Sequence, residues 1–139
     1  MRILKPLIAA SLFAFSAAAM AGPSAADRAA DRAAQAEAKL AKALDGRVAG
    51  KPVTCINLRD IDSSQIIDGT AILYKVGGTT YVNRPKIGAE SLRWDPILVT
   101  DTHSSQLCSI DTVKLIDRTS HFFQGFVGLG EFVPYRKPS

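Results

Sequence analysis

The chain has 139 residues, of which 47% are hydrophobic and 22% are charged, and it carries a formal net charge of +4 at pH 7. Its length fits one domain rather than two. Two of the basic residues lie within the first 21 positions, so the rest of the chain carries only +2 (15 Lys and Arg against 13 Asp and Glu), which is too little to indicate nucleic-acid or anionic-lipid binding.

Residues 1–21 contain the three parts of a secretory signal peptide. Arg2 and Lys5 form a basic start, residues 7–19 are almost wholly apolar, and small residues follow up to Ala21. The apolar stretch is shorter than the roughly 20 residues that a membrane-spanning helix needs. We therefore expect cleavage after Ala21 rather than a retained anchor, and a periplasmic or secreted protein with no stable membrane anchor.

Residues 22–50 differ in composition from the rest, because ten of the first 24 are alanine. Alanine is the best helix former, Ser24 is a favoured N-terminal cap, and Gly46 is a natural stop. These features predict a helix over about residues 25–44, followed by a turn-rich hinge. Because few large apolar side chains are present, we expect an exposed spacer helix; a thin coiled-coil seam of small residues is the alternative.

The clearest β pattern covers residues 64–83. The Asp-Gly pair at 68–69 and the Gly-Gly pair at 77–78 favour two-residue hairpin turns. Three antiparallel strands joined by such turns would place two pairs of residues opposite each other: Tyr74 with Tyr81, and Leu73 with Val82. Cross-strand pairs of this kind stabilise a sheet.

A mainly β domain is expected over residues 51–135, with residues 136–139 as a tail. Further β-like segments occur at 97–100, 106–108, 111–117 and 128–133, and an irregular crossing at 86–95 carries Trp94. Many short strands separated by turn signals indicate a small antiparallel β-barrel or sandwich.

Gly125, Gly128 and Gly130 resemble a phosphate-binding loop only in composition. A dinucleotide-binding loop leads from a strand into a helix, whereas residues 131–134 are β-like and end in a proline. We expect these glycines to serve backbone geometry, and we expect no cofactor.

Cys55 and Cys108 are the two cysteines of the chain. In an exported protein the pair indicates one disulfide. Such a bridge would close a long loop and stabilise the fold by roughly 4 kcal/mol. We therefore predict a structural disulfide.

Two other roles for the cysteines are chemically conceivable. Cys108 could be a nucleophile activated by His103, with Asp101 or Asp111 as orienter. A metal site would need both cysteines with His103 and His121, but none of these has the close pairing of a zinc knuckle. We expect no metal.

Asp101 and Asp111 flank a polar turn. Paired carboxylates can perform acid–base chemistry, although acids in loops more often cap turns. Because Asp111 closely follows Cys108, we expect it to cap a turn beside the disulfide.

Five aromatic residues lie in or next to the β-like segments: Tyr74, Tyr81, Phe122, Phe123 and Phe126. Together they could form a stacking surface for bases or sugars. Aromatic residues in alternating strands more often belong to the core, and we expect that here.

Several short motifs resemble a family of small exported proteobacterial proteins of unknown function. They are Pro52-Val-Thr-Cys-Ile56, Ile67-Asp-Gly-Thr70, Gly78-Thr-Thr-Tyr-Val-Asn83, Leu107-Cys-Ser-Ile-Asp111 and Gly128-Leu-Gly-Glu-Phe-Val-Pro-Tyr135. The resemblance covers about residues 46–135. Family members often carry two more cysteines, near 85–89 and 125–127, where this chain has none. The resemblance fits structural cysteines and implies no activity for any residue.

Taken together, these features predict a non-enzymatic binding or structural protein of the cell envelope. Its partner would be a protein or another envelope component. The rival hypothesis is a small periplasmic hydrolase or transferase that uses His103 with Asp101 or Asp111, which requires those side chains within hydrogen-bond reach.

Overall fold

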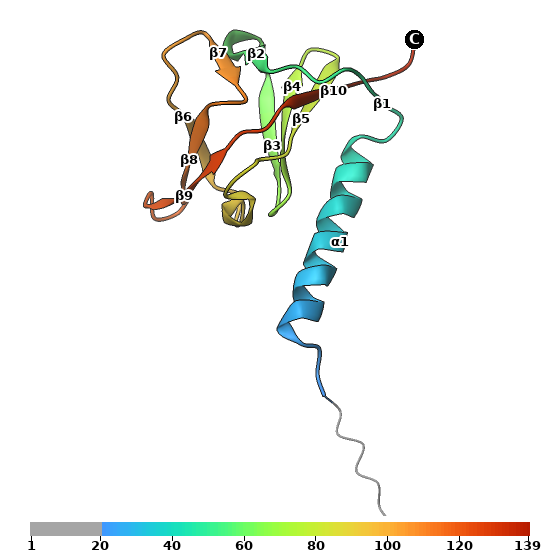
Figure 1. The fold of residues 1–139 in the computed structure, drawn as a ribbon, viewed down its shortest axis with the longest axis vertical. Coiled ribbons are helices and arrows are strands. Elements are labelled where there is room, and N and C mark those ends of the chain that lie inside the picture. Colours follow the sequence, from blue (N-terminus) through green and yellow to red (C-terminus); the bar gives the residue numbers. More distant parts are fainter. Residues whose placement is uncertain (1–20) are drawn as a thin grey trace, which may run out of the picture.

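The computed structural model describes residues 21–139, so the predicted signal peptide lies outside the described residues except for Ala21. One α-helix, α1 (Ala25–Ala43), precedes the strands of this part (Figure 1). The strands are β1 (Val48–Ala49), β2 (Cys55–Asn57), β3 (Ser63–Ile67), β4 (Ala71–Val76), β5 (Thr79–Asn83), β6 (Ile97–Thr100), β7 (Gln106–Cys108), β8 (Thr112–Ile116), β9 (Phe123–Gly128) and β10 (Phe132–Arg136). Two short 3-10 helices are η1 (Leu58–Asp60) and η2 (Ala89–Ser91).

The strands form three antiparallel sheets, and the predicted mainly β fold is confirmed. Their orders are β1-β10-β5-β4-β3, β2-β7 and β6-β8-β9. Each order ends in an edge strand, so among residues 21–139 the arrangement is sandwich-like and not a closed barrel. Within the same residues, no helix is long and apolar enough to span a membrane.

The β3–β4–β5 meander has the predicted register. Tyr74 lies opposite Tyr81, and Leu73 opposite Val82, across a two-residue Gly-Gly turn. The first turn differs from the prediction: Ile67 pairs with Ala71, so three residues connect β3 and β4. The middle residue of that connection is a glycine with φ of 63°, a left-handed conformation that favours glycine.

The main core lies between the five-stranded sheet and the two smaller sheets. Alternation along β4 sends Ile72 and Tyr74 into this core. Val113 and Leu115 enter it from β8, and Phe132 enters from β10. The ring of Phe132 lies 5.9 Å from that of Tyr74, centroid to centroid. This packing makes the β-domain a single folded unit.

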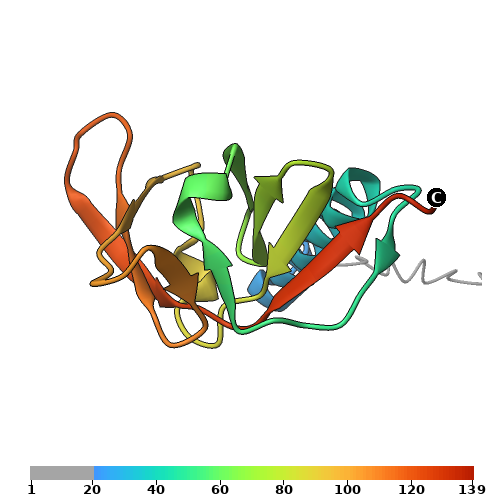
Figure 2. The ribbon, with the colours of Figure 1, turned by 90° about the horizontal axis from the view of Figure 1, so that it is seen from above.

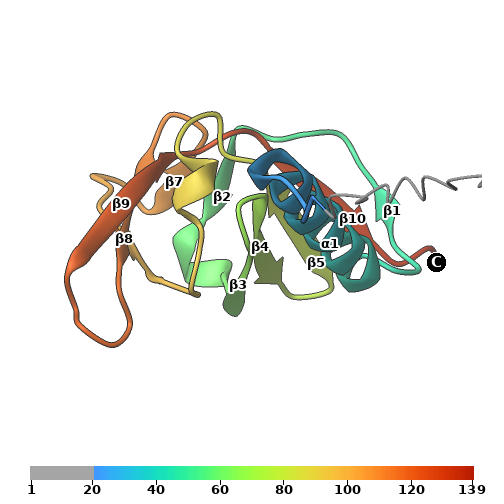
Figure 3. The ribbon, with the colours of Figure 1, turned by 90° about the horizontal axis from the view of Figure 1, so that it is seen from below.

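The opposite face of the five-stranded sheet is covered by α1, as Figure 3 shows from below. The helix begins with the expected cap, because Ser24 and Asp27 form a reciprocal capping box. Its Ala36 and Leu40 are each only 4% exposed and pack against a sheet cluster that includes Leu73. The expected exposed spacer is therefore only partly correct: the N-terminal half of α1 is exposed, and the C-terminal half docks.

An ion pair also joins α1 to the sheet. Arg84 follows β5 and donates two hydrogen bonds to the Glu37 carboxylate, at 2.7 and 3.0 Å. These hydrogen bonds lower the pKa of Glu37 and raise that of Arg84. Both side chains are more than half exposed, so the pair orients the helix more than it stabilises the fold.

The predicted hinge is bound to the sheet edge. Val48 and Ala49 form β1 and pair with Arg136 and Tyr135 of β10. The N–H of Gly50 donates to the carbonyl of Pro134 at 2.7 Å. The hinge and the first residue of the predicted tail therefore belong to the five-stranded sheet.

The glycine-rich segment predicted as one strand at 128–133 is divided between two sheets. β9 ends at Gly128, and β10 begins at Phe132. The fully buried Asn83 holds the connection by donating to the carbonyl of Gly130 at 2.7 Å and accepting from its N–H at 3.0 Å. A Cβ on Gly130 would collide with the carbonyl oxygen of Arg84, so this glycine does serve backbone geometry, as expected.

The predicted disulfide is confirmed. Cys55 and Cys108 occupy paired positions on β2 and β7, with Cα atoms 4.0 Å apart and a sequence separation of 53 residues. The bridge links the chain before the meander to the chain after β6, beside Ile56 and Leu107, which both enter the main core.

Candidate functional site

The proposed catalytic side chains face different partners. A carboxylate oxygen of Asp101 lies 3.6 Å from the Nζ of Lys114. Asp111 accepts a hydrogen bond from the N–H of Cys108 at 2.7 Å, which confirms its predicted role as a turn cap. His103 is exposed, and within residues 21–139 it makes no hydrogen bond to either carboxylate. The three side chains do not form a hydrogen-bonded catalytic set.

Both cysteines are consumed by the disulfide. In the described part of the chain, no group of three or more His, Cys, Asp and Glu side chains is placed to hold a metal ion. Two surfaces of the described residues stand out instead by their shape, apolar area or charge.

The first such surface is the outer face of the β6–β8–β9 sheet. Two rows of paired residues cross this face: Ile97, Ile116 and Phe123, and next to them Val99, Lys114 and Phe126. A β-bulge beside Ile116 gives β9 an extra residue, so Phe123 and Phe126 project from the same face although they are three apart. We call these six residues the outer sheet face.

The outer sheet face is apolar and open. The exposed fractions are 63% for Phe123, 49% for Phe126 and 40% for Val99, and the neighbouring Phe122 is 76% exposed. The expectation that these phenylalanines belong to the core is therefore wrong, whereas Tyr74 is buried as expected. The core positions of this sheet are taken by smaller side chains on its inner face.

The cations at the outer sheet face and its adjoining β8–β9 turn are paired with carboxylates. Its one charged member, Lys114, is paired with Asp101. The β8–β9 turn projects from the body at the end away from the C-terminus (Figure 2). In this turn, a guanidinium nitrogen of Arg118 lies 3.2 Å from a carboxylate oxygen of Asp95. The same turn also carries Asp117, whose carboxylate accepts hydrogen bonds from the N–H groups of Thr119 and Ser120. The surface thus presents apolar area whose two cations are paired.

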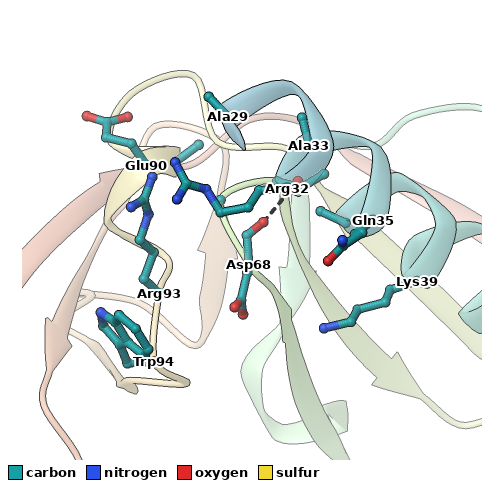
Figure 4. A pocket seen from close by; sticks show the side chains of 13 residues that line it. Ala29, Arg32, Ala33, Gln35, Lys39, Asp68, Glu90, Arg93 and Trp94 are labelled. Atoms are coloured by element: carbon teal, nitrogen blue, oxygen red, sulfur yellow. Dashed lines mark hydrogen bonds between the residues drawn. The ribbon is translucent and has the colours of Figure 1, made fainter. Parts of the chain in front are cut away.

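The second surface is a groove of about 460 Å³ between α1, the β3–β4 turn and the segment from η2 to Trp94 (Figure 4). Its charged lining residues are Arg32, Lys39, Asp68, Glu90 and Arg93. Trp94 is 82% exposed and borders the groove. We call this cavity the helix groove.

Comparison with protein-family models, curated proteins and solved structures finds no match to this chain.

Sequence reasoning missed the helix groove because it exists only where α1 docks on the sheet. A partial signal was present: Arg32 and Lys39 are seven residues apart, which places them on one side of a helix. The third cation, Arg93, comes from a segment far along the chain, and no local pattern links it to α1.

Proposed function

We propose that this chain is an exported, non-enzymatic protein of the cell envelope that binds another protein through its outer sheet face. The observation that carries the proposal is the exposure of Phe123 and Phe126 on one open sheet surface. Antiparallel sheets with one face in the core normally present polar residues to solvent on the other. A contiguous apolar face on an otherwise folded domain is typical of an interaction site.

A protein partner fits this face better than an anionic membrane does. Lipid headgroups attract unpaired cations, but Lys114 and Arg118 are each paired with a carboxylate. An apolar centre containing aromatic residues, with its cations paired, matches the anatomy of protein–protein interfaces. The expected partner is an envelope protein that presents an apolar patch.

Export is supported by two features of the chain. The disulfide between Cys55 and Cys108 is of a kind that persists in oxidising compartments. The first 21 residues have the pattern of a signal peptide. A periplasmic location is consistent with both.

The rival enzymatic hypothesis has less support. Asp101 is paired with Lys114, and Asp111 caps the Cys108 turn. General acid–base chemistry with His103 would require a carboxylate to be within hydrogen-bond reach of it.

The test compares partner capture by the exported wild-type chain with capture by the double variant Phe123→Ser/Phe126→Ser, after crosslinking in the native envelope. We expect the double variant to bind its partner at least about tenfold more weakly, since buried aromatic residues dominate interface energies. Ile110→Ser is the matched control, because Ile110 is 88% exposed but lies outside the outer sheet face.

Thermal unfolding of all three proteins shows that each is folded. The proposal is wrong if the double substitution leaves the amount of captured partner unchanged, or if Ile110→Ser lowers that amount equally. It is also wrong if the only complex lost on substitution is a dimer of the chain itself.

A further inference from the structure

Two walls of the helix groove, the β3–β4 turn and the segment after η2, are hydrogen-bonded to each other. The N–H of Gly69 in the β3–β4 turn donates to the carbonyl of Leu92 at 2.8 Å. The Gln124 amide donates to the carbonyls of Ser91 and Arg93, at 3.1 and 2.7 Å. The third wall, α1, docks on the sheet through Ala36 and Leu40, and Glu37 pairs with Arg84. A cavity whose walls are largely in place before binding needs less ordering when a ligand enters.

Three cations line this groove, and none of them forms a salt bridge within residues 21–139. Arg32 and Lys39 come from α1, and Arg93 follows η2. Among residues 21–139, no salt bridge joins any of them to Asp68 or Glu90, although both carboxylates line the same groove. Unpaired cations around one cavity create a positive potential that favours an anion.

The two arginines are arranged to share one anionic group. Figure 4 shows the Arg32 and Arg93 side chains pointing toward each other from opposite walls. Each guanidinium presents a planar fork of donors that matches a carboxylate or phosphate. An anion between them would relieve the repulsion of two like charges and accept hydrogen bonds from both.

The remaining lining suits a planar apolar group. The helix contributes Ala29, Ala33 and Ala36, whose small side chains leave room beside the charged residues. Trp94 stands at the border, largely exposed, with an indole ring that a planar ligand could contact. The volume of about 460 Å³ lies within the range of roughly 300–1,000 Å³ typical of small-molecule sites.

We propose that the helix groove binds a small organic anion, in which a planar ring carries a carboxylate or a phosphate ester. Arg32 and Arg93 hold the anionic group, Lys39 adds positive charge, and Trp94 contacts the ring. This site lies apart from the outer sheet face and does not depend on the proposed protein partner.

The experiment titrates the exported protein with phenyl phosphate and with benzoate, following the fluorescence of Trp94, the single tryptophan, and the heat of binding. The two probes distinguish a phosphate from a carboxylate as the anionic group. We expect a saturable change with at least one of them, much weaker binding of the uncharged benzamide, and loss of affinity as salt increases.

Variants assign the binding to the groove. Arg32→Gln and Arg93→Gln should each weaken binding by about tenfold or more, since each removes charge-assisted hydrogen bonds. Arg28→Gln is the matched control: Arg28 is exposed on the same helix but does not line the groove. Because Arg32 and Arg93 are exposed, thermal unfolding should be unchanged in all three variants.

The proposal is overturned if neither phenyl phosphate nor benzoate binds at millimolar concentration. It is also overturned if benzamide binds as well as benzoate, or if Arg28→Gln weakens binding as much as the groove variants do.

Discussion

Tyr74 buries a polar atom that the fold does not satisfy. Its hydroxyl is inside the main core and has no hydrogen-bond partner among residues 21–139. Burial also raises the pKa of the Tyr74 phenol, because the charged phenolate is disfavoured away from water. The residue contributes apolar area and ring packing against Phe132, at the cost of an unpaired hydroxyl.

We predict that Tyr74→Phe increases the free energy of unfolding by about 1 kcal/mol, because removing an unpaired buried hydroxyl removes its desolvation cost. The native phenol stays protonated, whereas the unfolded phenol ionises above about pH 10. Ionisation of Tyr74 therefore leaves the free energy of unfolding unchanged below about pH 10. As the pH rises further, the free energy of unfolding falls, because the unfolded phenol loses its proton while the native phenol keeps it.

Urea unfolding at pH 7 and at several values above pH 10 checks both parts. In alkaline solution the wild-type protein should lose stability more steeply than Tyr74→Phe. Subtracting the free energy of unfolding of the variant from that of the wild type at each pH removes the effect of the other tyrosines, which both proteins share. Two parallel pH profiles would contradict the account.

The element that the sequence describes least completely is α1. Composition and capping predict its start and approximate end, because helix propensity and caps act within a few residues. Docking depends instead on whether the sheet offers an apolar face at the right place. That face is formed by residues such as Leu73 and Val82. The residues next to Leu73 along β4, Ile72 and Tyr74, point to the opposite face and belong to the main core. The sheet is thus buried on both sides, which local alternation did not reveal.

We predict that Leu40→Ala decreases the free energy of unfolding by about 2–4 kcal/mol, because Leu40 is 4% exposed between α1 and the sheet and its truncation leaves a cavity. The helix content measured by circular dichroism should also fall if docking maintains α1, since an isolated helix of this length is marginal in water.

Lys42→Ala is the comparison on the same helix, because Lys42 is exposed and should change stability by less than about 0.5 kcal/mol. Equal effects of the two substitutions would show that α1 is an undocked spacer.

At the scale of the whole molecule, the disulfide is the main covalent constraint. It joins residues 53 apart and encloses the complete meander and β6. Cross-linking reduces the conformational entropy of the unfolded chain, and the effect grows with the enclosed length.

We predict that the double variant Cys55→Ser/Cys108→Ser loses about 4 kcal/mol of stability relative to the oxidised protein. Denaturant unfolding with and without a reducing agent measures the same quantity in the wild-type chain. Intact mass should show the protein isolated without a reducing agent about two hydrogens lighter than its reduced form; titratable thiols at both positions would refute the bridge.

The sequence by itself determined the features that depend on neighbouring residues. These are the mainly β class, the meander with Tyr74 opposite Tyr81, the capped helix, and the turn cap at Asp111. Each rests on backbone preferences or periodicity over a few positions. The cysteine pair was also predictable, because only two cysteines exist and the leader pattern indicates an oxidising compartment.

Only the tertiary structure decided which surfaces are covered. Periodicity shows that a strand has two faces, but not which of them another layer will bury. The phenylalanines of β9 therefore lie outside the core, while both faces of β4 lie inside. The helix groove likewise brings together Arg32, Asp68 and Arg93 from three separate segments. Such proximity is set by packing between distant parts of the chain, which no local pattern records.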